Sequence, residues 1–226
     1  AFLMLVFFYV FLAQLAILVP VFGIFAVLVL TPAMTVGFMT GCQRVILGER
    51  VLPSVYLVGI RDVGTEVRKN LLKLGTVYAF LILVLSLIAS SFIDFQQIMP
   101  LLTEQQAPNI REMKELYWGL GIGMCLYVPI AMLMWFSPIL IAWENMSVGQ
   151  ALFSSRIACW KNRAAFLVYL IFWGFLIIAI PFFLEALLDA LQLRVAIPFI
   201  IPPYSMAMLT IMYCSFFATW KACFTD

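Results

Sequence analysis

The sequence contains no histidine, and this absence argues against several kinds of chemistry. Haem inside a helix bundle usually takes an axial histidine, and most transition-metal sites use imidazole ligands. Serine hydrolases and many proton relays depend on histidine as well. We therefore expect no redox or metal chemistry carried by this chain alone, and no cofactor.

Charged residues are scarce too, at 11% of the chain against about 25% in soluble domains. Hydrophobic residues make up 65%, and the mean hydropathy is +1.11. No water-soluble fold could bury so many apolar side chains, so the surrounding medium is predicted to be lipid. Because a helix needs about 20 apolar residues to cross a bilayer, the 226 residues allow about five to seven spans.

Motifs for phosphate binding or hydrolysis are missing as well. No G-x-S-x-G occurs, and the G-x-G-x-G at Gly119, Gly121 and Gly123 is better explained by close helix packing. The cysteines form no C-x-x-C pair and are read as small apolar residues near helix ends, with a disulfide or a metal site as the alternative. They are Cys42, Cys125, Cys159, Cys214 and Cys223.

Six apolar runs predict an all-α, polytopic integral membrane helical bundle with about six transmembrane helices. Residues 1–43 would form a helix of about 64 Å, twice the thickness of a bilayer, so the chain must turn at VPVFG. The chain starts inside an apolar run, and we expect further residues upstream of Ala1. The predicted spans are 1–19, 22–43, 71–93, 117–143, 164–184 and 196–220.

The distribution of charge predicts an orientation. Ten cations lie within residues 44–73 and 144–163 or follow the last span, whereas the connections 94–116 and 185–195 carry three. Cytoplasmic loops are enriched in Lys and Arg. We therefore predict that both termini and the first two connections are cytoplasmic, and that the other two connections are periplasmic.

The two cytoplasmic connections resemble each other, and we call them the first elbow (44–70) and the second elbow (144–163). Each follows a Thr-Pro or Ser-Pro pair, and each has an arginine twelve residues after an acidic residue and then a Lys-Asn pair. These similarities predict an interfacial helix in each elbow. They also predict a parallel pseudo-repeat of span, elbow and span.

Both elbows carry basic residues that we predict to contact lipid headgroups, at about 1 kcal/mol each with anionic lipid. These residues are Arg61, Arg68, Lys69, Arg156, Lys161 and Arg163. The cations are too sparse, and too closely flanked by spans, for nucleic acid. The second elbow also has small residues at the helical spacing that lets another helix approach closely. They are Ala151, Ser154, Ser155 and Ala158.

Three acidic residues are the candidates for a polar site. Glu185 and Asp189 lie one helical turn apart and could share a proton or hold a cation; the alternative is a solvated outer face. Glu144 ends the fourth span, where it could pair with Arg156 or Arg61 or serve a functional role.

The segment SPILIAWENMSVGQALFSSRIACWKNRAAF resembles a segment that recurs in six-span bacterial inner-membrane families. Together with LTPAMTVGFMTGC and SFFATWKACF, it makes the chain similar to an uncharacterised inner-membrane protein family of beta-proteobacteria. More distantly, the chain is similar to the membrane domain of some glycerophosphodiester phosphodiesterases. The resemblance implies a fold and a membrane location but no catalysis, because the catalytic residues of those diesterases belong to a separate soluble domain.

Three functions remain open from the sequence. The first is a non-enzymatic scaffold or accessory subunit of a larger membrane complex, with membrane lipids and other integral membrane proteins as partners. The second is a transporter of lipid or a small amphiphile, or a membrane-homeostasis factor. The third, and the least favoured, is a membrane-embedded enzyme that uses Glu144, Glu185 or Asp189.

Overall fold

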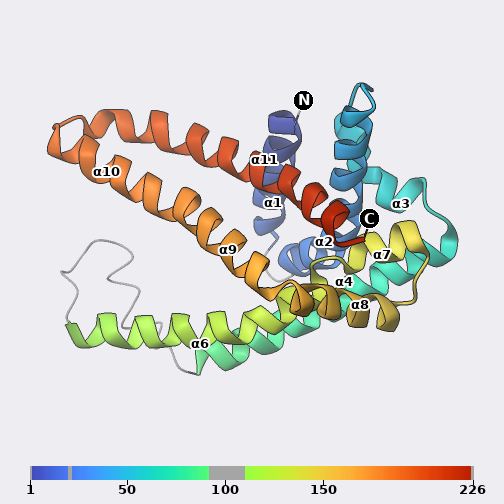
Figure 1. The fold of residues 1–226 in the computed structure, drawn as a ribbon. Coiled ribbons are helices and arrows are strands. Elements are labelled where there is room, and N and C mark those ends of the chain that lie inside the picture. The colour runs from blue at the N-terminus through green and yellow to red at the C-terminus, as the bar shows by residue number, and fades with distance from the viewer. Residues whose placement is uncertain (1, 20–21, 92–109, 225–226) are drawn as a thin grey trace.

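The computed structural model describes residues 2–19, 22–91 and 110–224, and every regular element in these ranges is helical (Figure 1). The chain is therefore an all-α polytopic membrane protein, as the sequence predicts. The elements are α1 (Phe2–Ile17), α2 (Phe22–Ile46), η1 (Pro53–Leu57), α3 (Val58–Arg61), α4 (Thr65–Ser90), α6 (Ile110–Met134), α7 (Ser137–Glu144), α8 (Val148–Lys161), α9 (Arg163–Gly174), η2 (Phe175–Ala179), α10 (Ile180–Ala190), η3 (Arg194–Ala196) and α11 (Ile197–Phe224).

Five stretches among the described residues are long and apolar enough to cross a membrane. The first run contains α1, whose 16 residues fall short of the roughly 20 that a span requires. The five stretches are Phe22–Ile46, Thr65–Ser90, Tyr117–Glu144, Arg163–Ala190 and Arg194–Phe224.

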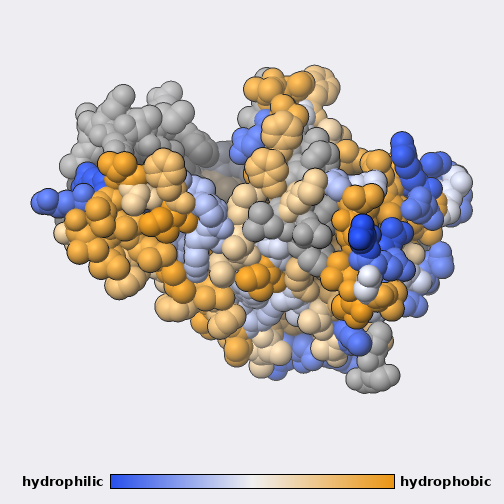
Figure 2. Space-filling view, turned by 90° about the horizontal axis from the view of Figure 1, so that it is seen from above, coloured by the Kyte–Doolittle hydropathy of each residue, from blue (hydrophilic) through white to orange (hydrophobic). Residues whose placement is uncertain are grey.

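Two helical hairpins extend from a common centre (Figure 1). The first hairpin pairs α4 with α6, and the second pairs α9, η2 and α10 with α11. We call the centre the hub: it consists of α7, α8 and the parts of α2 and α4 that pack against them. Seen from above, apolar side chains cover much of the hairpin end, and hydrophilic side chains gather mainly at the hub end (Figure 2).

The second hairpin contains a proline break whose lost hydrogen bond is replaced by a side chain. Pro181 lacks an N–H group, and the turn before it widens into the π-helix η2. The Tyr204 hydroxyl of α11 donates to the Leu176 carbonyl oxygen in this turn at 2.8 Å. In lipid, a broken helix is tolerated where a neighbouring helix satisfies the freed backbone groups in this way.

The two elbows differ in structure. The second elbow contains a 14-residue helix, α8. The first elbow has no single helix: α2 ends before Gly48, which has a φ of 78°, and the short elements η1 and α3 then follow. Glycine and proline interrupt this segment, since Gly48 takes a left-handed turn and Pro53 begins η1.

The other two connections are described to different extents. Residues 92–109, which are most of the connection 94–116, lie outside the described ranges. In the connection 185–195, α10 continues the preceding span to Ala190, and η3 follows.

Candidate functional site

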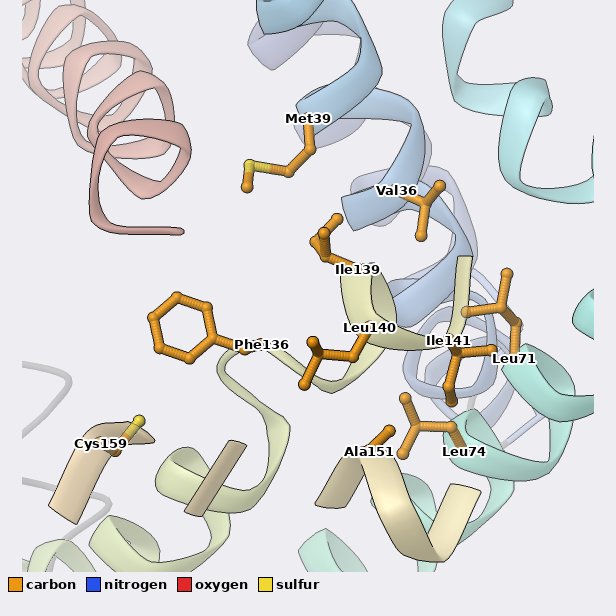
Figure 3. Packing of buried hydrophobic residues seen from close by; sticks show 10 residues of the cluster. All are labelled: Val36, Met39, Leu71, Leu74, Phe136, Ile139, Leu140, Ile141, Ala151 and Cys159. Atoms are coloured by element: carbon orange, nitrogen blue, oxygen red, sulfur yellow. The ribbon is translucent and has the colours of Figure 1, made fainter. Parts of the chain in front are cut away.

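The hub is built around ten buried apolar residues from α2, α4, α7, α8 and the α6–α7 junction (Figure 3). Three consecutive residues of α7, Ile139, Leu140 and Ile141, are all buried. Three consecutive helical residues point in different directions, so protein covers this part of α7 on several sides and α7 lies at the centre of the hub. The ten residues are Val36, Met39, Leu71, Leu74, Phe136, Ile139, Leu140, Ile141, Ala151 and Cys159.

Ser155 of α8 joins the two halves of the broken fourth span. The Phe136 amide donates to Ser155 Oγ at 3.0 Å, and Ser155 Oγ donates to the Met132 carbonyl at 2.8 Å. In an unbroken α-helix, the amide of residue 136 would donate directly to the carbonyl of residue 132. The hydroxyl is thus inserted into the hydrogen-bond ladder, a recognised cause of a kink.

Aromatic rings connect the hub to the second hairpin. Trp135 meets Phe166, Tyr169 and Phe216 edge to face, with ring centroids 5.3, 6.0 and 4.9 Å apart. Edge-to-face pairs of this kind contribute about 0.5–1.5 kcal/mol beyond their buried area. Trp135 lies at the break between α6 and α7 in the fourth span, whereas Phe166 and Tyr169 lie on α9 and Phe216 lies on α11. The cluster therefore holds these three parts of the chain together.

The first elbow packs on α2 through glycine. A Cβ atom at Gly59 would collide with the Ala33 carbonyl oxygen, next to Pro32. A Cβ at Gly37 would lie 2.5 Å from the Val55 carbonyl oxygen and 2.7 Å from Tyr56 Cα. These backbones touch because neither glycine has a side chain. Tyr56 is buried at this contact, and its burial raises the pKa of the phenol.

The predicted stripe of small residues faces the fourth span. Ala151 and Ser155 are both 0% exposed, and Ser154 and Ala158 are half-buried. α8 packs against α6 and α7 on this side. The stripe thus packs within the chain and is not available for another protein.

The six predicted lipid-contacting cations are all exposed. At the start of α4, the Nζ atom of Lys69 lies 2.9 Å from Oε1 of Glu66 and forms an ion pair with it. In the second elbow, the guanidinium of Arg163 lies over the Trp160 ring, 5.6 Å from its centroid. Arg156 and Lys161 form no ion pair with any residue that the structure describes.

The three candidate acids do not come together. Glu144 is exposed at the end of α7 and, within the described ranges, pairs with neither Arg156 nor Arg61. Asp189 forms an ion pair with Arg194, and Glu185 is exposed one turn away on α10. A shared proton or a cation at Glu185 and Asp189 therefore stays a prediction.

Metal ligands do not converge in the described part of the chain, where no group of three or more His, Cys, Asp or Glu residues occurs. Burial raises the pKa of the Cys159 thiol to about 12, so this cysteine stays protonated at neutral pH. A cavity of about 30 Å³ lies between α1, α2, η1 and α11, and its lining residues include Tyr9 and Tyr213. This volume holds about two water molecules.

The sequence did not reveal the roles of Ser155 and Gly59. Ser155 was recognised only as a small residue, because its partners lie about twenty positions earlier in the chain. No sequence pattern around Gly59 indicates that it contacts α2. The Ser-Pro and Thr-Pro pairs that open the elbows were the available clue, since both elbows fold back onto those prolines.

Comparison with known proteins gives one informative match. The chain is 35% identical to a probable inner membrane protein of Burkholderia thailandensis over 229 residues, covering 99% of this chain and 84% of the relative. No family model and no solved structure matches. The match supports the resemblance to an inner-membrane family; the similarity to phosphodiesterase membrane domains and the cytoplasmic placement of both termini stay predictions. The chain belongs to the family of this probable inner membrane protein.

Proposed function

We propose that this inner-membrane protein is a non-enzymatic scaffold or accessory subunit that receives helices of another membrane protein. The observation that carries the proposal is that the helices of the second hairpin are hardly buried by the rest of the chain. Only 6% of the most apolar stretch of each of its two long segments is buried within the chain, against 39% in α2. Surfaces of this extent must contact lipid or another protein.

The glycines of α6 indicate that another protein, and not lipid alone, contacts this helix. Gly59 and Gly75 are each in close contact with another backbone, and neither has room for a Cβ atom. By contrast, a Cβ at Gly121 or Gly123 would meet nothing within 4 Å. Glycine in a transmembrane helix permits close approach of a second helix. Since nothing in the described chain uses these two positions, they suit a helix from a partner.

The alternative of a transporter has less support. The cavity between α1, α2, η1 and α11 is about 30 Å³, far smaller than the roughly 300–1,000 Å³ of pockets for small molecules. Catalysis also has little support, because Glu144, Glu185 and Asp189 lie apart or at exposed positions.

Photo-crosslinking in native membranes tests the proposal. A photoreactive residue is placed at Met124, beside the open glycines of α6, or at Leu87 of α4 as the matched control, since both side chains are 71% exposed. We expect position 124 to give an adduct with one defined membrane protein and position 87 to give adducts with lipid.

The variant Gly121→Leu with Gly123→Leu should abolish the adduct at position 124 and leave helicity unchanged. Loss of folding in this variant would be recognised by circular dichroism. Lipid adducts alone at both positions, in a chain with both glycines intact, would overturn the proposed function.

A further inference from the structure

The outer face of α8 has no role in the packing described above. Ala151, Ser155 and Cys159 occupy the inner face of this helix and are buried. Opposite them, Phe153, Ile157 and Trp160 recur at i, i+4 and i+7 and form an exposed apolar ridge. Phe153 is 64% exposed and Trp160 is 60% exposed. The helix is therefore apolar on two opposite sides.

Cations border this ridge along both edges. At 100° per residue, Arg156 falls on one side of the ridge and Lys161 on the other. Arg163 follows the helix and stacks on Trp160. Long basic side chains beside an apolar surface can reach headgroups while their stems stay in the apolar layer, and tryptophan favours the same depth.

We infer that α8 is a binding site for an anionic phospholipid. Acyl chains lie along the ridge, and the phosphate accepts hydrogen bonds from Arg156 of α8 and from Arg163, the first residue of α9; these two residues precede and follow Trp160 in the chain. Charge complementarity selects this occupant: three cations lie within eight residues, and α8 itself contains no acidic residue. Amphipathic helices that lie in the membrane interface combine the same two elements, an apolar face and flanking cations.

The inference is independent of the proposed scaffold function, which depends on α6 and the second hairpin. A lipid bound at α8 would also bear on the hub, because Ser155 on the opposite face of the same helix completes the fourth span.

The test uses the full chain in phosphatidylcholine nanodiscs that contain a minor fraction of phosphatidylglycerol, with native mass spectrometry to count bound lipids. We expect the wild-type chain to enrich phosphatidylglycerol over phosphatidylcholine. Each arginine is expected to contribute about fivefold to the affinity for anionic lipid. The double variant Arg156→Gln with Arg163→Gln should therefore reduce the enrichment by about 25-fold. The matched variant Arg61→Gln with Arg68→Gln removes the same charge from the first elbow. Its loss of enrichment should be clearly smaller, because the first elbow has no single helix that places cations along an apolar ridge.

A second measurement locates the lipid. Phosphatidylglycerol with brominated acyl chains should quench tryptophan fluorescence in the wild-type chain, and Trp160→Phe should remove that part of the quenching. If the double arginine variant fails to fold, Arg163→Lys and Trp160→Phe still test the site, because each is a conservative change at an exposed position.

Three outcomes would overturn the inference. The first is an equal loss of enrichment in both arginine pairs, which would indicate attraction by net charge alone. The second is displacement of the lipid by soluble glycerol phosphate at similar concentrations, which would indicate a site for free phosphate. The third is unchanged quenching in Trp160→Phe, which would place the lipid elsewhere. Finding an acidic protein bound at α8 in place of lipid would likewise overturn the inference.

Discussion

The first and second elbows both return the chain to a proline in the helix before them, but the contacts differ in kind. Gly59 of the first elbow lies against the Ala33 backbone beside Pro32, and Gly37 of α2 lies against the backbone of Val55 and Tyr56. In the second elbow, the Ser155 hydroxyl enters the break next to Pro138 and bonds to both freed backbone groups. One elbow depends on the absence of a side chain, and the other depends on one oxygen atom.

The difference follows from the helices that the elbows meet. α2 continues through Pro32 as one helix, and the Thr31 hydroxyl donates to the Val27 carbonyl at 2.8 Å one turn earlier. The fourth span instead separates into α6 and α7, so Phe136 and Met132 need a partner from outside the helix. Small residues suit both tasks because each requires close approach, and their chemistry decides which task they perform.

The largest effect is expected at the first elbow, for Gly59→Val. The new side chain would collide with the Ala33 backbone, which cannot move without shifting α2. We expect the free energy of unfolding to fall by about 3 kcal/mol or more, as measured by titration with SDS in mixed micelles.

Gly149→Ala in α8 is the control for this change, since its Cβ would meet nothing within 4 Å. Alanine should be neutral there or stabilise the helix by up to about 1 kcal/mol. Equal losses at positions 59 and 149 would mean that close backbone contact does not distinguish the elbows.

A smaller effect is expected for Ser155→Ala in the second elbow. This change removes the hydroxyl and leaves the buried Phe136 amide and Met132 carbonyl without their partner. The expected loss is about 1–3 kcal/mol of unfolding free energy in the same titration. Ser154→Ala, one position away and half-buried, should cost less than about 0.5 kcal/mol. A neutral Ser155→Ala would show that α6 and α7 rejoin without the serine.

Tyr204→Phe extends the comparison to the second hairpin, where a hydroxyl again satisfies a broken helix. The Leu176 carbonyl would lose its 2.8 Å hydrogen bond, but η2 is not part of the buried core. Hydrogen bonds between transmembrane helices average about 0.6 kcal/mol, and we expect a loss of that size. If Tyr204→Phe lowered the unfolding free energy as much as Ser155→Ala does, burial in the hub would not explain the larger loss expected for Ser155→Ala.

The last prediction, with the smallest expected signal, concerns the extent to which a thiol reagent labels Cys159. We expect no reaction of this thiol in the folded chain. Its pKa of about 12 leaves only about one part in ten thousand as thiolate at pH 8. Raising the pH from 9 towards 12 should ionise the thiol and remove the stability that the neutral form contributes. Mass spectrometry after maleimide treatment, with an SDS-denatured sample as the positive control, measures the reaction. Labelling at Cys159 itself in native protein at pH 8 would mean that the inner face of α8 is open, whereas the exposed Cys125 is expected to react.

The sequence determined the medium, the helical class and the approximate positions of the apolar runs, because these depend on composition and segment length alone. A helix must satisfy its backbone groups internally in lipid, so 65% hydrophobic residues allow few other folds. The positions of the elbows were also predictable, since charges and the Ser-Pro and Thr-Pro pairs are local features.

The partners of these residues were decided only by the tertiary structure. Ser154 and Ser155 are the same residue type at adjacent positions, yet only Ser155 reaches the break between α6 and α7. Gly59 and Gly121 look alike in sequence, but one is pressed against α2 and the other meets nothing within 4 Å. Which side chain fills a gap depends on the angle at which two helices cross, and that angle is fixed by contacts between residues far apart in the chain.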